Sequence, residues 1–233
     1  MDSTVAIDGR FFSGLAEPVD FFIMRHGESE ANASGRIQGH ADFPLNENGR
    51  AQAKAAASYL ADKGIRKVFS SPLRRAADTA RAVSSALGLA SPLIEPALSE
   101  LDTGCFTGLT MNEIRERFPL DYTRFRSKSW EGVSGAETIE SLERRAKAVW
   151  AMLRDEAMSS TGNLLALTHG GTIQWLVRVC FGSRSWIPIL PTGNCCIYRL
   201  SVEPNTDGSP AFVQWRDLNT SAADGLSRVA PVF

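Results

Sequence analysis

Two histidines of the chain stand at positions where side chains can meet at the edge of a sheet. The segment Arg25-His26 directly follows an apolar run at 21–24, and Thr168-His169 follows a strand-like run at 163–167. Arg74 and Arg75 come shortly after a third run. Runs of this length are typical of strands that are buried on both faces. Because ligands bind beyond the carboxyl ends of parallel strands, we expect these histidines and arginines to converge.

The types of these side chains indicate phosphoryl chemistry. An arginine binds phosphate through two parallel hydrogen bonds, and a helix N-terminus adds backbone N–H donors. A neutral imidazole can attack phosphorus and form a covalent intermediate. The leaving oxygen needs a proton, which Glu100, after a weak strand at 93–94, can supply. We interpret His40 as a polar loop residue and predict no metal site, since a three-histidine zinc site would need every histidine of the chain.

Strands and helices alternate along the chain. Further strands are expected at 67–70, 196–202 and 212–215, and helices from Asn46 to Gly64, from Pro72 to Gly88, from Thr110 to Pro119, from Glu137 onward and after His169. This order predicts an α/β fold: a three-layer sandwich with a mostly parallel central sheet, helices on both faces and the two late strands antiparallel at an edge. Residues 118–136 are expected to be irregular.

The composition is that of an ordinary globular protein. Of the 233 residues, 43% are hydrophobic and 22% are charged, and the formal net charge is −1. This balance argues against nucleic acid or a membrane as the main partner, so anion binding must be local. We interpret residues 1–20 as an N-terminal arm and residues 21–233 as one domain. Four scattered cysteines, with no secretory leader and no membrane-spanning apolar run, predict a cytoplasmic protein. Nothing in the pattern selects an oligomeric state.

Five motifs, in order, resemble the signature of the histidine phosphatase superfamily, in its phosphoglycerate-mutase-like branch. They are RHGESEAN at 25–32, RIQG at 36–39 with DFPLNENG at 42–49, SSPLRRAADTA at 70–80, the acidic segment around Glu100, and THG at 168–170. The resemblance covers residues 21–202. It implies a phosphoglycerate-mutase-like fold and a broad-specificity phosphatase that needs no cofactor.

The resemblance also implies roles for five residues. His26 would be the phosphorylated nucleophile. Glu100 would be the general acid and then the base for water. Arg25, Arg75 and His169 would hold the transferring phosphoryl group. We interpret the adjacent arginine, at position 74, as a solvated helix residue.

The rim of the site is implied in the same way. Asn32 and the N–H of Gly170 would be further phosphate donors, and Gln38 would lie at the substrate rim. Two segments depart from the family pattern: CFTG at 105–108 replaces an aromatic-Glu-Gly, and GAET at 135–138 replaces a GGES box. Both lie outside the implied phosphoryl pocket, so the departures concern the choice of substrate rather than catalysis.

A basic cluster in the predicted irregular segment has two interpretations. Arg124, Arg126 and Lys128, with Trp130, form either an ordinary solvated face or a lid that faces the substrate. A lid of this kind would favour a phosphorylated acid or sugar.

The sequence therefore predicts a metal-independent phosphomonoesterase that hydrolyses a small phosphorylated metabolite through a phosphohistidine. One alternative is a phosphoglycerate mutase, which returns the phosphoryl group to the substrate. The other is a non-catalytic phosphate-binding module, against which the intact set of catalytic residues argues. A mutase must exclude water from the phosphohistidine, and the stretch from Glu100 to His169 leaves little chain for that purpose. Hydrolysis is therefore the favoured reaction.

Overall fold

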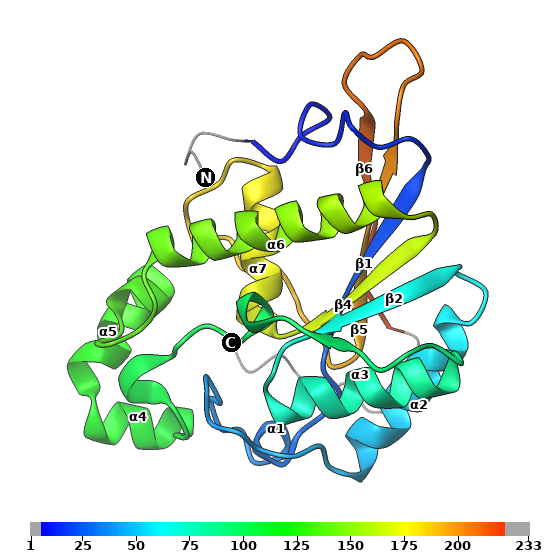
Figure 1. Cartoon of the computed structure of the whole chain (residues 1–233). Coiled ribbons are helices and arrows are strands. Elements are labelled where there is room, and N and C mark those ends of the chain that lie inside the picture. The colour runs from blue at the N-terminus through cyan, green and yellow to red at the C-terminus, as the bar shows by residue number, and fades with distance from the viewer. Residues whose placement is uncertain (1–5, 222–233) are drawn as a thin grey trace.

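One six-stranded sheet forms the centre of the molecule in a computed structural model, which describes residues 6–221 (Figure 1). The strands are β1 (Val19–Arg25), β2 (Ile65–Ser70), β3 (Leu93–Ile94), β4 (Asn163–Thr168), β5 (Cys196–Glu203) and β6 (Phe212–Ser221), in the order β3-β2-β4-β1-β5-β6. The first four strands are parallel, whereas β5 and β6 are antiparallel at one edge, as predicted. Arg25 at the end of β1 pairs with Thr168 at the end of β4. The two residues that follow these strand ends, His26 and His169, therefore lie side by side at the same edge of the sheet.

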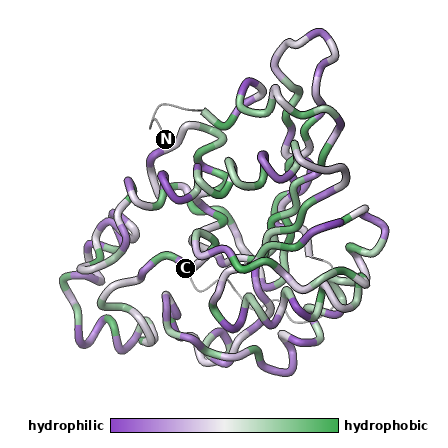
Figure 2. The backbone as a smooth tube through the Cα atoms, in the orientation of Figure 1, coloured by the Kyte–Doolittle hydropathy of each residue, from purple (hydrophilic) through white to green (hydrophobic). Residues whose placement is uncertain are grey.

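Helices cover both faces of this sheet (Figure 1). They are α1 (Glu30–Ala33), α2 (Glu47–Leu60), α3 (Arg74–Ala86), α4 (Met111–Arg117), α5 (Pro119–Lys128), α6 (Ile139–Ser159) and α7 (Gly170–Cys180), with 3-10 turns at Pro96–Leu98, Gly104–Phe106 and Ser129–Gly132. Phe21 and Ile23 of β1 pack in one core with α6 and α7, and Phe22 and Met24 pack in a second core with α2 and α3. This alternation follows from the two-residue period of a strand. Figure 2 shows the hydrophobic strands between more polar outer segments. The predicted three-layer α/β sandwich is confirmed.

Side chains at the helix starts fix where the helices begin. The Asn46 side chain accepts a hydrogen bond from the Gly49 N–H and caps α2. Thr110 and Glu113 form the predicted capping box of α4. In contrast, α7 begins after His169 without a capping hydrogen bond from the side chain of that residue. Its first N–H groups are therefore available to other acceptors.

The segment 118–136 differs from the prediction of an irregular stretch. It contains α5 and a 3-10 turn. Pro119, which we interpreted only as the end of α4, occupies the first turn of α5, where a missing N–H breaks no helical hydrogen bond. No residue of α5 is fully buried. The helix therefore lacks the apolar periodicity from which a helix can be predicted.

The residues before β1 are also closer to the core than predicted. Ile7, Phe12 and Leu15 are buried and belong to the same hydrophobic core as α6 and α7. The Phe12 ring packs edge-on against Trp150, with centroids 6.2 Å apart. The N-terminal arm at 1–20 stays a prediction, but these three residues belong to the core, although their irregular spacing gives no periodic signal in the sequence. The single domain at 21–233 stays a prediction, and 222–233 lie outside the described residues.

No helix within 6–221 combines the length and apolarity needed to cross a membrane.

Candidate active site

His26 leaves the end of β1 with its ring enclosed, and the residue is 1% exposed. Its Nδ1 lies 2.7 Å from the carbonyl oxygen of Gly27. A carbonyl can only accept a hydrogen bond, so Nδ1 carries the proton and Nε2 keeps its lone pair. The Nε–H of Arg75 donates to this Nε2 over 3.3 Å. The ring is thus held in the Nδ1-protonated tautomer, which a nucleophile needs. Its unprotonated Nε2 faces the guanidinium of Arg75.

Arg75, in the first turn of α3, is fully buried and links His26 to the rim of the site. Its Nη1 donates to the carbonyl oxygen of Ala41 at 2.9 Å, and its Nη2 donates to that of Gly39 at 2.8 Å. Burial lowers the pKa of Arg75 to about 10, so the guanidinium is still charged at neutral pH. The neighbouring Arg74 has an exposed side chain that pairs with Asp78, as expected of a solvated helix residue.

His169 approaches His26 from the end of β4. The two ring centroids are 5.1 Å apart, so one phosphoryl group can contact both rings. The Nε2 of His169 lies 2.7 Å from the hydroxyl oxygen of Ser71, directly after β2. Its Nδ1 is buried and has no partner within the described part of the chain. No role was predicted for Ser71, although its place directly after a strand in the SSPL motif was a usable signal.

Burial and two arginines keep both histidines uncharged. Burial lowers the pKa of His26 well below its ordinary value, and the charges of Arg75 and Arg25 lower it further. Burial, followed by Arg75, likewise lowers the pKa of His169. At neutral pH both imidazoles are therefore neutral. The Arg25 guanidinium donates to the carbonyl oxygen of Thr192 through Nη1, and its buried Nε has no partner among residues 6–221. That N–H remains a donor for an anion.

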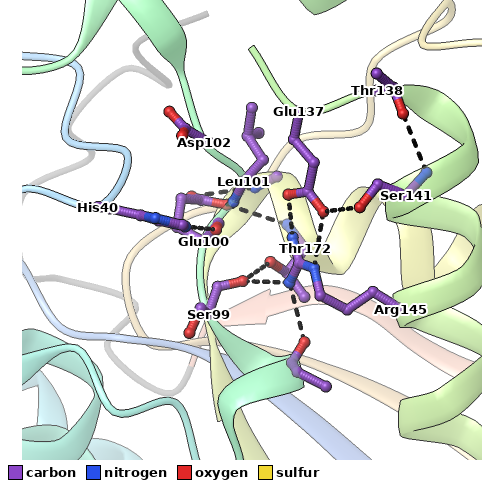
Figure 3. A network of polar contacts seen from close by, with 12 residues as sticks. His40, Ser99, Glu100, Leu101, Asp102, Glu137, Thr138, Ser141, Arg145 and Thr172 are labelled. Carbon is purple, nitrogen blue, oxygen red and sulfur yellow. Dashed lines mark hydrogen bonds and ion pairs between the residues drawn. The ribbon is translucent and has the colours of Figure 1, made fainter. Parts of the chain in front are cut away.

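Glu100 lies just beyond the 3-10 turn that follows β3 and is 8% exposed. Its Oε1 accepts hydrogen bonds from the N–H groups of Leu101 at 3.0 Å and Thr172 at 3.2 Å, and its Oε2 accepts from Gly171 at 3.3 Å (Figure 3). Two of these donors, Gly171 and Thr172, belong to the first turn of α7. Burial lowers the pKa of Arg25, and the nearby charge of Glu100 opposes that effect. The carboxyl group is thus fixed to the helix that begins after His169.

Asn32 and Gln38 are buried in a polar network around Ser29. The Asn32 side-chain oxygen accepts hydrogen bonds from the Ser29 N–H and from the Asn194 amide, so its own NH₂ group is left to donate. The Gln38 side-chain oxygen accepts from the Ser29 hydroxyl at 2.8 Å. The Asn32 geometry agrees with the implied role as a phosphate donor.

Gly170 allows the chain to pass close to the residues around Arg25. A Cβ at this position would lie 2.9 Å from the hydroxyl oxygen of Thr192 and 3.7 Å from the Arg25 Cζ. The N–H of Gly170 is the first of α7, at the helix end that attracts anions. This position fits the implied role of Gly170 as a phosphate donor.

A small pocket brings many of these groups together. Among the predicted residues, Arg25, His26, Asn32, Gln38 and Glu100 line it. Arg75 and His169 are absent from the lining and reach the site through their approach to His26. A larger hollow at the opposite end of β1, between residues 16–19 and 157–162, contains none of these groups.

The basic cluster divides between the pocket and the solvent. Trp130 is buried and lines the pocket. Arg124, Arg126 and Lys128 are exposed along α5, which supports the solvated face over the substrate-facing lid.

His40 is exposed and donates through Nε2 to the carbonyl oxygen of Glu100 at 2.7 Å, in keeping with a loop residue. Residues 6–221 contain no group of three or more His, Cys, Asp or Glu side chains that could hold a metal ion.

Comparison with known proteins places this site in a family. The family model "Histidine phosphatase superfamily (branch 1)" matches residues 21–217. The chain therefore belongs to the histidine phosphatase superfamily, and the resemblance seen in the motifs is confirmed.

The relatives of this chain include proteins named as phosphatases and a protein named as a mutase. The chain is 31% identical over 205 residues to a glucosyl-3-phosphoglycerate phosphatase of Mycolicibacterium vanbaalenii, covering 83% of this chain and 90% of that protein. It is 33% identical over 159 residues to a 2,3-bisphosphoglycerate-dependent phosphoglycerate mutase of Rhizobium etli, covering 66% and 76%. The solved structure of a mycobacterial glucosyl-3-phosphoglycerate phosphatase in complex with VO3 aligns with a TM-score of 0.76 and 27% identity over 88% of this chain and all of that chain. The predicted class, a phosphatase with a histidine nucleophile, and the phosphoglycerate-mutase-like fold are thus confirmed.

Proposed function

We propose that the protein hydrolyses a phosphomonoester of a small metabolite, with Nε2 of His26 as the nucleophile. One observation carries this proposal: the lone pair of a neutral, buried imidazole faces the Nε–H of Arg75 at 3.3 Å, and a second imidazole lies alongside. A nitrogen held in this way can attack an anionic phosphoryl group without first losing a proton.

The first step transfers the phosphoryl group to the enzyme. Nε2 of His26 attacks phosphorus, and the bond from phosphorus to the leaving oxygen breaks. Glu100, in its protonated form, gives its proton to that oxygen. Arg25, Arg75 and His169 hold the phosphoryl oxygens, with the Asn32 amide and the Gly170 N–H as further donors.

The second step releases phosphate. A water molecule attacks phosphorus, and the carboxylate of Glu100 takes one proton from it. The bond between nitrogen and phosphorus breaks, and its electron pair returns to Nε2. Glu100 is then protonated again, so the enzyme is ready for the next substrate.

The substrate class follows from the rim and from the relatives. Arg36 lines the pocket beside Gln38; its Nη1 is paired with Glu113, and we propose that the rest of its guanidinium meets a second anionic group of the substrate. The glucosyl-3-phosphoglycerate phosphatase relative is named for a phosphorylated acid that carries a sugar. We therefore propose a phosphorylated acid or sugar as the substrate, with neither nucleic acid nor a membrane as partner. The four free cysteines support a cytoplasmic location.

A phosphate-release assay with EDTA present tests the function. The panel contains p-nitrophenyl phosphate, 3-phosphoglycerate, phosphoserine and glucosyl-3-phosphoglycerate. We expect phosphate release by the native chain, none by His26→Ala, and an acid-labile, base-stable phosphate trapped on His26 during turnover. Interconversion of 3- and 2-phosphoglycerate that outpaces phosphate release would show a mutase instead. Binding of phosphate without turnover of any substrate would show a non-catalytic module.

A further inference from the structure

A partly buried ion pair lies beside the acid and outside the pocket lining (Figure 3). Arg145 donates to Glu137 through Nη2 at 2.7 Å and through Nε at 3.1 Å. The two side chains are only 18% and 14% exposed. Burial raises the pKa of Glu137, but the hydrogen bonds and charge of Arg145 outweigh burial and hold that pKa below its ordinary value. At neutral pH the pair is therefore a carboxylate and a guanidinium joined by two hydrogen bonds.

The same guanidinium holds the main chain just before Glu100. Arg145 Nη1 donates to the carbonyl oxygen of Ala97 at 2.9 Å and to that of Ser99 at 2.5 Å. The Thr172 hydroxyl donates to the Ser99 carbonyl as well, at 2.6 Å. The peptide group that precedes the acid is thus fixed from both α6 and α7.

Glu137 holds the main chain on the other side of the acid. Its N–H donates to the carbonyl oxygen of Asp102 at 2.9 Å. Its carboxylate binds Arg145, so one ion pair reaches both ends of the segment 99–102. The departure from the family's GGES box leaves this glutamate in place, next to the Thr138 cap of α6.

Glu100 needs such support because it lies between regular elements. No helix or strand includes residues 99–103, so no repeating hydrogen bonds fix the direction of this side chain. A general acid must lie within about 2.6–3.2 Å of the oxygen that it protonates. A misplacement of about 1 Å can lower a rate by about 10²-fold.

We propose that Arg145 is a positioning residue for Glu100: with Glu137, it fixes the main chain on both sides of the acid and thereby the place of its carboxyl group. The proposal rests on the proposed function, in which Glu100 protonates the leaving oxygen. An ion pair that served stability alone would change the rates of all substrates alike. A positioning residue changes the rate only where proton donation by Glu100 matters.

The test compares two leaving groups in the full chain. 3-Phosphoglycerate releases an alkoxide that must be protonated, whereas p-nitrophenyl phosphate releases a phenolate that needs little protonation. For Arg145→Met, we expect kcat/KM for 3-phosphoglycerate to fall by about 10²-fold and that for p-nitrophenyl phosphate by less than about threefold. Arg144→Met is the matched control, since Arg144 is the adjacent residue and is exposed. It should leave both values unchanged.

A double-mutant cycle separates positioning from stability. Once Glu100→Gln has removed the acid, adding Arg145→Met should cost no further activity on 3-phosphoglycerate. Additive losses, or equal losses on both substrates, would overturn the proposal.

Two further variants keep the outcome decisive. If Arg145→Met does not fold, Glu137→Gln with Arg145→Met removes both charges and leaves no unpaired buried carboxylate, and the same difference between substrates is expected. Glu100→Gln alone must also show this difference. If it loses activity equally on both substrates, the acid role in the proposed function fails together with the positioning role. If it shows the difference and the Arg145 variants do not, only the positioning role fails.

Discussion

Arg75 donates to the reactive nitrogen of His26, whereas the neighbouring Arg74 points to solvent, so the two residues form a matched pair. We expect Arg75→Ala to lower kcat/KM by about 10²-fold or more, because a fixed donor to the transferring phosphoryl group is lost. Arg74→Ala should leave kcat/KM nearly unchanged. Initial rates of phosphate release measure both. Comparable losses in the two variants would contradict the assignment of the buried guanidinium.

Ser71 provides a second test at single-residue scale. Its hydroxyl contacts Nε2 of His169 and accepts a hydrogen bond from the Leu73 N–H, but it does not contact His26, so its loss should weaken the support of the second ring without removing the nucleophile. We expect Ser71→Ala to lower kcat by up to about tenfold, the value of one hydrogen bond, while phosphate is still trapped on His26. The trapped species and kcat are measured on the same sample. A variant with unchanged kcat would show that the contact has no part in turnover.

Some residues of the site could be predicted from the sequence because they directly follow strands. His26 and His169 are of this kind, and parallel strands necessarily bring their ends to one edge. Asn194 and Arg145 were given no role, because each reaches the site through a side-chain contact with a residue far away in the chain. Glu137 precedes the Thr138 cap of α6 and Arg145 lies within that helix, so their spacing in the sequence does not indicate an ion pair.

At the scale of the elements, α2 approaches the loop after His26 so closely that Gly49 has no room for a side chain. A Cβ there would lie 2.0 Å from the carbonyl oxygen of Glu28. In an open helix, replacing glycine by alanine gains about 1 kcal/mol, but a clash with backbone reverses that sign. We therefore expect Gly49→Ala to lower the melting temperature and kcat together. Lys54→Ala, exposed on the same helix, is the control. A Gly49→Ala variant as stable and active as the native chain would contradict this close approach.

Which elements could be predicted depended on their burial. The strand at 21–24 and the stripe of α7 that contains Ile173 and Leu176 are buried, and burial imposes the apolar run of the strand and the apolar stripe of the helix that mark them in the sequence. Helix α5 is held at the surface, and its residues carry no such pattern. The segment that holds Phe12 is buried but has no regular repeat, so neither a helix nor a strand pattern identifies it.

At the scale of the whole molecule, two buried neutral histidines make stability depend on pH. In the unfolded chain their pKa is about 6.5. In the folded chain burial, with the charge of Arg75, holds the pKa of His26 and His169 well below that value. Between these values the unfolded chain binds more protons. The free energy of unfolding therefore keeps its full value above about pH 6.5 and falls as the pH drops below it.

Urea unfolding from about pH 7.5 to about pH 5 measures this dependence. The variant His26→Asn with His169→Asn lacks both imidazoles, so its free energy of unfolding should fall less steeply over the same range. An equally steep fall in that variant would mean that other groups cause the pH dependence.

The carbonyl oxygen of Gly27 orients His26 without placing a full negative charge beside it. In Ser-His-Asp hydrolases a carboxylate takes this position next to the histidine. A carboxylate about 4 Å from a phosphoryl oxygen would repel each negative charge by about 4 kcal/mol at an effective dielectric constant of about 20. The molecule as a whole, with a net charge of −1, exerts no long-range pull on an anion. A neutral orienting group therefore lets this site aim its nucleophile and still attract the anion that the nucleophile attacks.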